Sequence, residues 1–398
     1  MYSKVFRWLL LSFIFIRPFF SSFAFRKFDL IFAIIFIILT FIYLKLIKRV
    51  GGTKYDFFFF IFILTLIASS IFSSNPVRSF KIILTYIFYI SIFYFTYFEE
   101  DKDSIFFMLI VSGLFLSFYA LYMYFLIPYT LNYLTEHQLR FPFAEEFLSR
   151  KRAFYPFVLP NLLGGYLTML LPLGVGGFLR EIKKEGVYKG RLVFICISIG
   201  FYFILLLLTK SLGAWVSLFS AVVIFFLARR RITKKSITLI VFFVLMIGAI
   251  FFARQRGELF TTPLFSLERR ISYWQDTLKI VKEHPFSGVG LGNFYLRKSL
   301  FAHNSYLQLW AEAGVFAFLS YLGIIFLFLK KSWEKIKKGY NGYSSGIFIG
   351  GLSFIIHNLI DFSFFSPQVS FLWWMILAFA IQETGSFRKS SKDNKKGY

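Results

Sequence analysis

The chain has 398 residues, of which 58% are apolar and 23% aromatic, and its 45 lysines and arginines against 20 aspartates and glutamates give a formal net charge of +25. This composition excludes an ordinary soluble globular protein. The single cysteine, Cys196, also excludes an intrachain disulfide and a thiolate metal cluster. We therefore predict an all-α protein, a polytopic transmembrane helical bundle.

Apolar stretches close to the roughly 20 residues that a helix needs to cross a bilayer recur along the chain. They predict about twelve spans, at residues 6–25, 29–47, 55–73, 80–98, 104–127, 157–179, 191–209, 212–228, 236–253, 304–329, 343–365 and 367–384. Arg17-Pro18 interrupts the first span and is expected to break it or end it early. No small-residue cleavage site follows that span, so we expect a retained helix and not a removed signal peptide.

Clusters of basic residues alternate from loop to loop, which predicts that both termini are cytoplasmic. The clusters on that side are Lys45 to Arg49, Arg180 to Arg191, Arg229 to Lys235, Lys330 to Lys338 and the tail from Arg388. We expect residues 1–387 to form one transmembrane domain and residues 388–398 to form a disordered cytoplasmic tail.

Two loops that this topology places outside, residues 128–156 and 254–303, are also basic. Cations on the translocated side oppose the topology signal, so anionic headgroups or pyrophosphates are their natural partners. The alternative is snorkelling towards lipid phosphates, which we assign to roughly half of these residues but not to the Arg269-Arg270 pair. The basic residues are Arg140, Arg150, Lys151, Arg152, Arg254, Arg256, Arg269, Arg270, Lys279, Lys282, Arg297 and Lys298.

The larger outer loop, between spans nine and ten, contains a predicted helix. Its apolar residues recur at helical spacing, so the helix is expected to lie along the membrane face with Trp274 at headgroup depth. Arg270 falls one turn before Trp274 on the border of that face and is expected to point at a pocket beneath it. The apolar positions are Leu267, Ile271, Trp274, Leu278 and Val281.

A glycine run, Gly288 to Gly292, follows the end of this helix at His284-Pro285. It is only superficially similar to a dinucleotide fingerprint, because no strand precedes it and no crossover unit encloses it. Its expected role is to turn the backbone. A second expectation is that its amide N–H groups are exposed and can bind an anion.

The stretch that begins at His303 places an imidazole, an amide and a carboxylate at the mouth of an apolar helix. His303 and Asn304 precede the helix, and Glu312 lies one turn after Gln308, where it is expected to organise the His303 end. The dipole at a helix N-terminus disfavours a cation, so we expect a neutral imidazole, the form that a general base requires. The alternative is a histidine that merely lies at the interface.

Ionisable groups inside spans are costly and are usually paired or functional. His357 and Asp361 are four residues apart in the eleventh span, which predicts a structural pair or, second, a role in shaping an acceptor site. Asp101-Lys102-Asp103 resembles a metal-holding carboxylate pair but lies in a short loop without a nucleotide-binding domain. No cluster has metal-ligand spacing, so we expect neither a metal nor another cofactor.

The motifs of the large loop follow one another within residues 269–320: Arg270 and Trp274, then Pro285, Gly288, Gly290, Gly292 and Phe294, then His303-Asn304, Tyr306, Leu307, Glu312 and Gly314. This block resembles the O-antigen ligase and Wzy-type polymerase superfamily of bacterial membrane glycosyltransferases. The twelve-span layout with one large outer loop is similar too, so the resemblance covers most of the chain. It does not separate ligase from polymerase.

The resemblance implies a metal-independent, inverting transfer of a glycan from an undecaprenyl-pyrophosphate carrier to an acceptor sugar hydroxyl. It also implies that His303 is the base, that Arg270 binds the pyrophosphate, and that the site faces the periplasm from the inner membrane. The family's second arginine stands in a Ser-Arg-Gly context. Here Ser211 and Gly213 flank Leu212 instead, so Lys210 is a candidate for the missing charge.

We accordingly expect a ligase-like enzyme with lipid A–core or another glycan as acceptor, contacts with membrane lipids, and no nucleic acid. The candidate pyrophosphate-binding residues are Arg270, Arg269, Lys210 and Arg152, and the candidate supporting residues are Asn304, Tyr306, Glu312, Trp274, His357 and Asp361. The alternatives are a polysaccharide polymerase with the same chemistry and a polytopic transporter or lipid flippase. The chain shows no related halves of the kind that many transporters have.

Overall fold

The computed structural model describes residues 2–20, 26–48, 51–137, 148, 150–183, 188–229, 234–255, 265–297, 299–337 and 342–381. These ranges are helical and contain no strand, apart from an isolated bridge between Leu296 and Ser299. The predicted disordered tail, 388–398, lies outside them, as do Arg140, Arg256 and Lys298.

Each predicted span coincides with a helix. The helices are α1 (Tyr2–Ile16), α2 (Arg26–Leu46), α3 (Asp56–Ile71), α4 (Pro76–Phe98), α5 (Lys102–Phe125), α8 (Pro160–Glu181), α9 (Lys189–Thr209), α10 (Leu212–Ala228), α11 (Lys234–Gln255), α13 (Ser305–Lys337), α14 (Gly342–His357) and α15 (Pro367–Ile381). Within the described ranges, six helices are long and apolar enough to cross a membrane: α2, α4, α5, α8, α9 and α13. Shorter apolar segments lie in α3, α10, α11 and α15. The chain is therefore a polytopic helical membrane protein, as predicted.

The first span is interrupted where the sequence predicts. Helix α1 ends at Ile16, and Arg17–Phe19 form a 3-10 turn, η1. Arg17 is buried, and its Nη2 lies 2.7 Å from Oδ1 of Asp29 in the first turn of α2. An ion pair therefore joins the two helices at this break.

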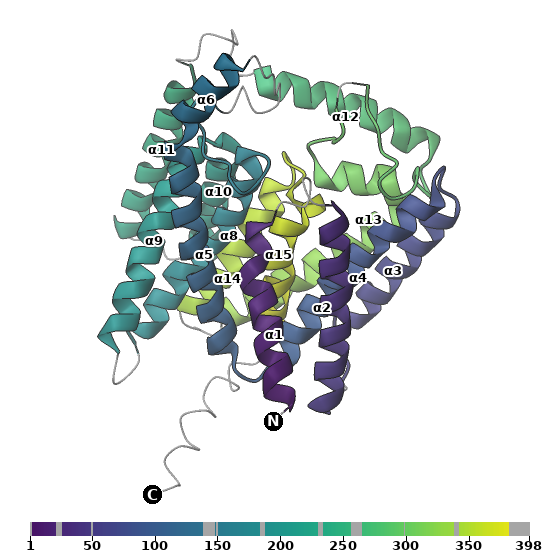
Figure 1. The fold of residues 1–398 in the computed structure, drawn as a ribbon, viewed down its shortest axis with the longest axis horizontal. Coiled ribbons are helices and arrows are strands. Elements are labelled where there is room, and N and C mark those ends of the chain that lie inside the picture. The colour runs from purple at the N-terminus through teal and green to yellow at the C-terminus, as the bar shows by residue number, and fades with distance from the viewer. Residues whose placement is uncertain are drawn as a thin grey trace, which may run out of the picture.

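Helix α15 lies in the middle of the bundle and is buried along nearly its whole length (Figure 1). Beside it, α14 packs tightly on α8 because glycines remove the side chains between the two backbones. A Cβ on Gly350 would lie 2.9 Å from the carbonyl of Met169, and one on Gly176 would lie 2.7 Å from the carbonyl of Gly342. This close approach fixes where the end of α14, with His357, meets the start of α8.

Helices α6 (Ile127–Glu136) and α12 (Phe265–Glu283) lie outside the predicted spans, at the end of the bundle opposite the N-terminus (Figure 1). Helix α12 runs across this end. The predicted helix of the large loop is therefore confirmed. Below, this end is called the α12 end.

The glycine run turns the backbone against α13, as predicted. Val289 N–H donates to the carbonyl of Ala311 at 2.9 Å, and Gly290 N–H donates to that of Glu312 at 2.8 Å. Helix α13 accommodates this contact by a break at Gly314, where φ is 79° and ψ is 175°. Because Gly290 N–H and Gly292 N–H both donate to Glu312, these amides are not available to an external anion.

This break predicts a stability effect that depends on position. Gly314→Ala should lower the free energy of unfolding by about 1–3 kcal/mol from the backbone conformation alone, with a further loss because the Cβ would meet the carbonyl of Phe286. Gly200→Ala is the matched control, since a Cβ there meets nothing within 4 Å. Thermal unfolding in detergent should show a clearly lower midpoint for the first variant only. Equal midpoints would contradict the break at Gly314.

Candidate functional site at the α12 end

His303 lies at the entrance to α13. Asn304 caps this helix, because its Oδ1 accepts from the N–H groups of Tyr306 and Leu307 at 3.0 and 3.1 Å. His303 itself has a φ of 51°, a left-handed conformation that residues other than glycine rarely adopt. The chain therefore turns sharply at the histidine before the helix begins.

Hydrogen bonds on both sides hold this turn. On one side, Ala302 N–H donates to Oε1 of Gln308 at 3.1 Å. On the other, Ser305 N–H lies 2.9 Å from the carbonyl of Asn358 and 3.0 Å from that of Asp361. The position of His303 is thus fixed to its own helix and to the turn that follows α14.

The His303 ring lies among aromatic side chains. Its centroid is 5.1 Å from that of Phe362, edge to face, and 5.9 Å from that of Tyr273 on α12. Burial lowers the pKa of His303 to about 4, the Asp361 carboxylate opposes this, and the Arg270 guanidinium reinforces it. The lowered pKa favours the neutral imidazole that the sequence predicts, and burial is its largest cause.

Arg270 reaches the same region from α12. Burial lowers the pKa of Arg270, and the negative charge of Asp361 opposes that shift. The neighbouring Arg269 is exposed, because successive residues of a helix are about 100° apart around its axis. The structure therefore brings Arg270, and not Arg269, together with His303 and Asp361.

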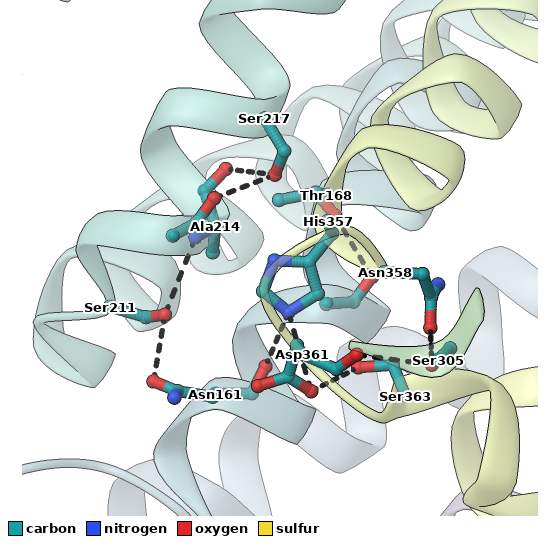
Figure 2. A network of polar contacts seen from close by, with 12 residues as sticks. Asn161, Thr168, Ser211, Ala214, Ser217, Ser305, His357, Asn358, Asp361 and Ser363 are labelled. Carbon is teal, nitrogen blue, oxygen red and sulfur yellow. Dashed lines mark hydrogen bonds and ion pairs between the residues drawn. The ribbon is translucent and has the colours of Figure 1, made fainter. Parts of the chain in front are cut away.

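The predicted pair of His357 and Asp361 is confirmed, with Nε2 of the histidine 3.8 Å from Oδ1 of the aspartate. Figure 2 shows Asp361 and Asn161 on the same side of the His357 ring, and the carbonyl of Asn161 lies 3.2 Å from the same Nε2. Ser363 Oγ donates to Oδ1 of Asp361 at 2.8 Å, whereas Oδ2 is buried without a hydrogen-bond partner. Asp361 lies in the turn after α14 and not within the helix.

Lys210, between α9 and α10, and Arg152, in the segment before α8, form a second cationic group. Arg152 is buried, and its guanidinium donates to the carbonyl of Thr209 at 2.9 Å and to Oδ1 of Asn161 at 3.2 Å. Lys210 Nζ donates to the carbonyl of Arg150 at 2.8 Å. Burial, together with the charges of Arg152 and Lys151, lowers the pKa of Lys210.

Asn161, in the first turn of α8, connects the two groups and was not predicted from the sequence. Its side-chain oxygen accepts from Arg152 and from Ser211 Oγ, while its carbonyl meets His357 (Figure 2). The available signal was a polar residue directly after Pro160 at the start of an apolar span. Which helix it faces is not visible in the sequence.

The other predicted supporting residues stabilise this arrangement. Tyr306 donates its hydroxyl to the carbonyl of Ile355 at 2.8 Å and so ties α13 to α14. Glu312 is buried and accepts from Gly292 N–H and from the Gln308 amide. Trp274 is half-buried on α12. Within the described ranges, no group of three or more His, Cys, Asp or Glu side chains has the arrangement of a metal site.

The site therefore combines a neutral imidazole, an inward-facing guanidinium and a buried carboxylate at one end of the bundle. A neutral imidazole can accept a proton. The guanidinium of Arg270 and the cationic group of Lys210 and Arg152 favour an anionic ligand. The carboxylate favours the protonated imidazole once it forms.

Comparison with known proteins bears on the same region. Residues 192–322 match the family model described as O-antigen ligase. The match includes Lys210, Arg270, His303 and Glu312 and leaves out Arg152, Asn161, His357 and Asp361. No curated protein matches the chain.

The low pKa of His303 predicts a pH-dependent stability. Between about pH 6.5, the ordinary histidine value, and about pH 4, the unfolded chain binds a proton that the folded site does not. Stability should therefore fall as the pH drops through this window. His303→Gln removes this contribution, so its thermal midpoint should fall less than that of the wild type between pH 7 and pH 4.5. Parallel curves for the two proteins would contradict a neutral His303.

Proposed function

We propose that this protein, whose residues 192–322 match the family model described as O-antigen ligase, transfers a glycan from an undecaprenyl-pyrophosphate carrier to an acceptor sugar hydroxyl. The proposed acceptor is lipid A–core, at the outer face of the bacterial inner membrane. The convergence of Arg270, His303 and Asp361 at the α12 end carries this proposal.

The proposed reaction is a single displacement with inversion. The acceptor oxygen forms a bond to the anomeric carbon of the donor glycan while His303 accepts the hydroxyl proton. The bond between that carbon and the pyrophosphate oxygen breaks, and its electron pair leaves with the pyrophosphate. A positioned base of this kind contributes about 10²–10⁴-fold to the rate.

Arg270 is proposed to stabilise the departing pyrophosphate. Its planar guanidinium can donate two parallel hydrogen bonds to phosphate oxygens, and these strengthen as negative charge develops. Asp361 is proposed to stabilise the imidazolium, since its carboxylate favours the charged form of His303 and its Oδ2 is buried without a hydrogen-bond partner. The two charges that the reaction creates are thus each met by a group of opposite sign.

Lys210 is proposed to supply the second phosphate contact that Leu212 cannot make. Arg152 supports it, because its guanidinium holds the carbonyl of Thr209, directly before Lys210. Arg269, exposed on α12, is proposed to contribute only long-range attraction of the anionic donor.

The arginine prediction separates a defined site from a diffuse cationic surface. Arg270→Lys keeps the charge but loses the planar fork, so the transfer rate should fall by at least about tenfold. Arg297→Ala is the matched control, because Arg297 is exposed beyond the glycine turn; its rate should stay within about twofold. Lys210→Ala should fall between them. Similar mild losses in all three would favour the transporter or flippase alternative.

The base assignment is tested with the protein reconstituted in liposomes with undecaprenyl-pyrophosphate-linked oligosaccharide and lipid A–core. His303→Ala should abolish transfer while membrane insertion and the unfolding midpoint remain near those of the wild type. Near-normal transfer by this variant would exclude His303 as the base. A product that contains two donor glycans in place of a glycan on lipid A–core would identify a polymerase.

Metal independence is a separate prediction of this mechanism, because cationic side chains and not a Lewis acid stabilise the leaving group. Transfer should continue at an unchanged rate in excess EDTA. Complete loss of activity that a divalent cation restores would show that the mechanism uses a metal.

A further inference from the structure

We infer that Gln308 is a positioning residue for His303, that it acts through the peptide N–H of Ala302, and that Glu312 sets its orientation. This inference rests on the proposed function, because it requires His303 to be the base. It concerns a buried polar relay that runs from the glycine turn to the residue before the histidine.

The relay consists of three hydrogen bonds in series. Gly292 N–H donates to Oε2 of Glu312 at 2.8 Å, the Gln308 Nε2 amide donates to Oε1 of Glu312 at 2.9 Å, and Ala302 N–H donates to Oε1 of Gln308 at 3.1 Å. Gln308 is 2% exposed, Glu312 is 4% exposed and Ala302 is fully buried. Because water does not reach these groups, the loss of one hydrogen bond leaves a buried donor or acceptor without a partner, which is unfavourable.

The polarity of the relay determines which way the Gln308 amide faces. Glu312 accepts a hydrogen bond on each oxygen, so its carboxylate must meet the NH₂ side of the glutamine. The carbonyl side of Gln308 then has to face Ala302. Arg78 lies beside the far end, because a Cβ on Gly292 would be 3.3 Å from its Nε. The backbone amide of Gly292 thus fixes Glu312, with the Arg78 cation nearby, and Glu312 fixes Gln308.

His303 needs such an anchor because its left-handed backbone is unfavourable, by about 1–3 kcal/mol for a residue of this kind. The hydrogen bonds of Ser305 hold only the C-terminal side of the residue. Without the bond at Ala302, the peptide between Phe301 and Ala302 loses the hydrogen bond at its N–H and keeps the one from Ser299 Oγ to its carbonyl, so the peptide tilts and the imidazole shifts. A misplacement of about 1 Å can cost about 10²-fold in rate.

The bond from Ala302 to Gln308 is not needed to begin α13. Asn304 already caps the first turn, and Ser305 already ties the helix to the α14 turn through both its N–H and its hydroxyl. What the extra bond adds is an anchor at the N–H of the peptide between Phe301 and Ala302, whose carbonyl already accepts from Ser299 Oγ at 2.7 Å. Its effect should therefore appear in catalysis more than in folding.

Exchanging the two side chains tests this inference in the full-length, reconstituted protein. Gln308→Glu places two carboxylates against each other, so kcat should fall by about 10–100-fold while KM for undecaprenyl-pyrophosphate-linked oligosaccharide stays within about twofold. The double variant Gln308→Glu/Glu312→Gln restores every donor and acceptor of the relay. Its kcat should return to within about fivefold of the wild type.

Gln368→Glu is the matched control, since Gln368 is a buried glutamine in α15 whose amide donates to the carbonyl of Pro18 at 2.6 Å. It makes the same chemical change without a link to His303, so kcat should change by less than about threefold. If Gln308→Glu does not reach the membrane, Gln308→Met carries the test, with the same loss of kcat expected.

Three results would overturn the inference: a wild-type kcat for the Gln308 variants, a double variant no better than the worse single variant, or an effect confined to KM. The proposed function fails separately, if His303→Ala retains transfer. An inactive His303→Ala protein together with fully active Gln308 variants would therefore refute the positioning role alone.

Discussion

A buried carboxylate at the end of a helical bundle is unfavourable by several kcal/mol unless nearby cations or donors compensate it. Asp361 is 1% exposed and receives one side-chain hydrogen bond, from Ser363. The position of Arg270, His303 and His357 around it follows from this requirement. Helix α12 must lie across the bundle for Arg270 to act on Asp361, and the entrance to α13 must bind the turn after α14.

Tight packing deeper in the bundle makes this arrangement rigid. The glycines of α14 and α8 bring the two backbones into contact, so the end of α14 has little freedom to move. A Cβ on Gly165 would lie 2.8 Å from the His357 ring, which shows how closely α8 confines it. Asn161 then extends the same contact to Arg152 and Ser211. Rigid support of this kind is what a positioned base and a phosphate-binding cation require.

Much of the fold follows from the sequence, because apolar length predicts spans and helical spacing predicts α12. The inward direction of Arg270 follows from local geometry in the same way, whereas the Asn304 cap was not predicted from the sequence. The sequence could not reveal Asn161 or the polarity of Gln308, because both depend on which helices become neighbours. Arg269 was grouped with Arg270 by composition, yet one residue of helical rotation separates their surroundings.

The central claim is that Arg270, His303 and Asp361 form one site for a polyprenyl pyrophosphate. A cryo-electron microscopy structure of the protein with undecaprenyl pyrophosphate in nanodiscs tests it most directly. The account predicts phosphate density within hydrogen-bond distance of the Arg270 guanidinium, with the His303 imidazole facing the terminal phosphate. Phosphate density elsewhere on the bundle, away from the Arg270 guanidinium, would contradict it.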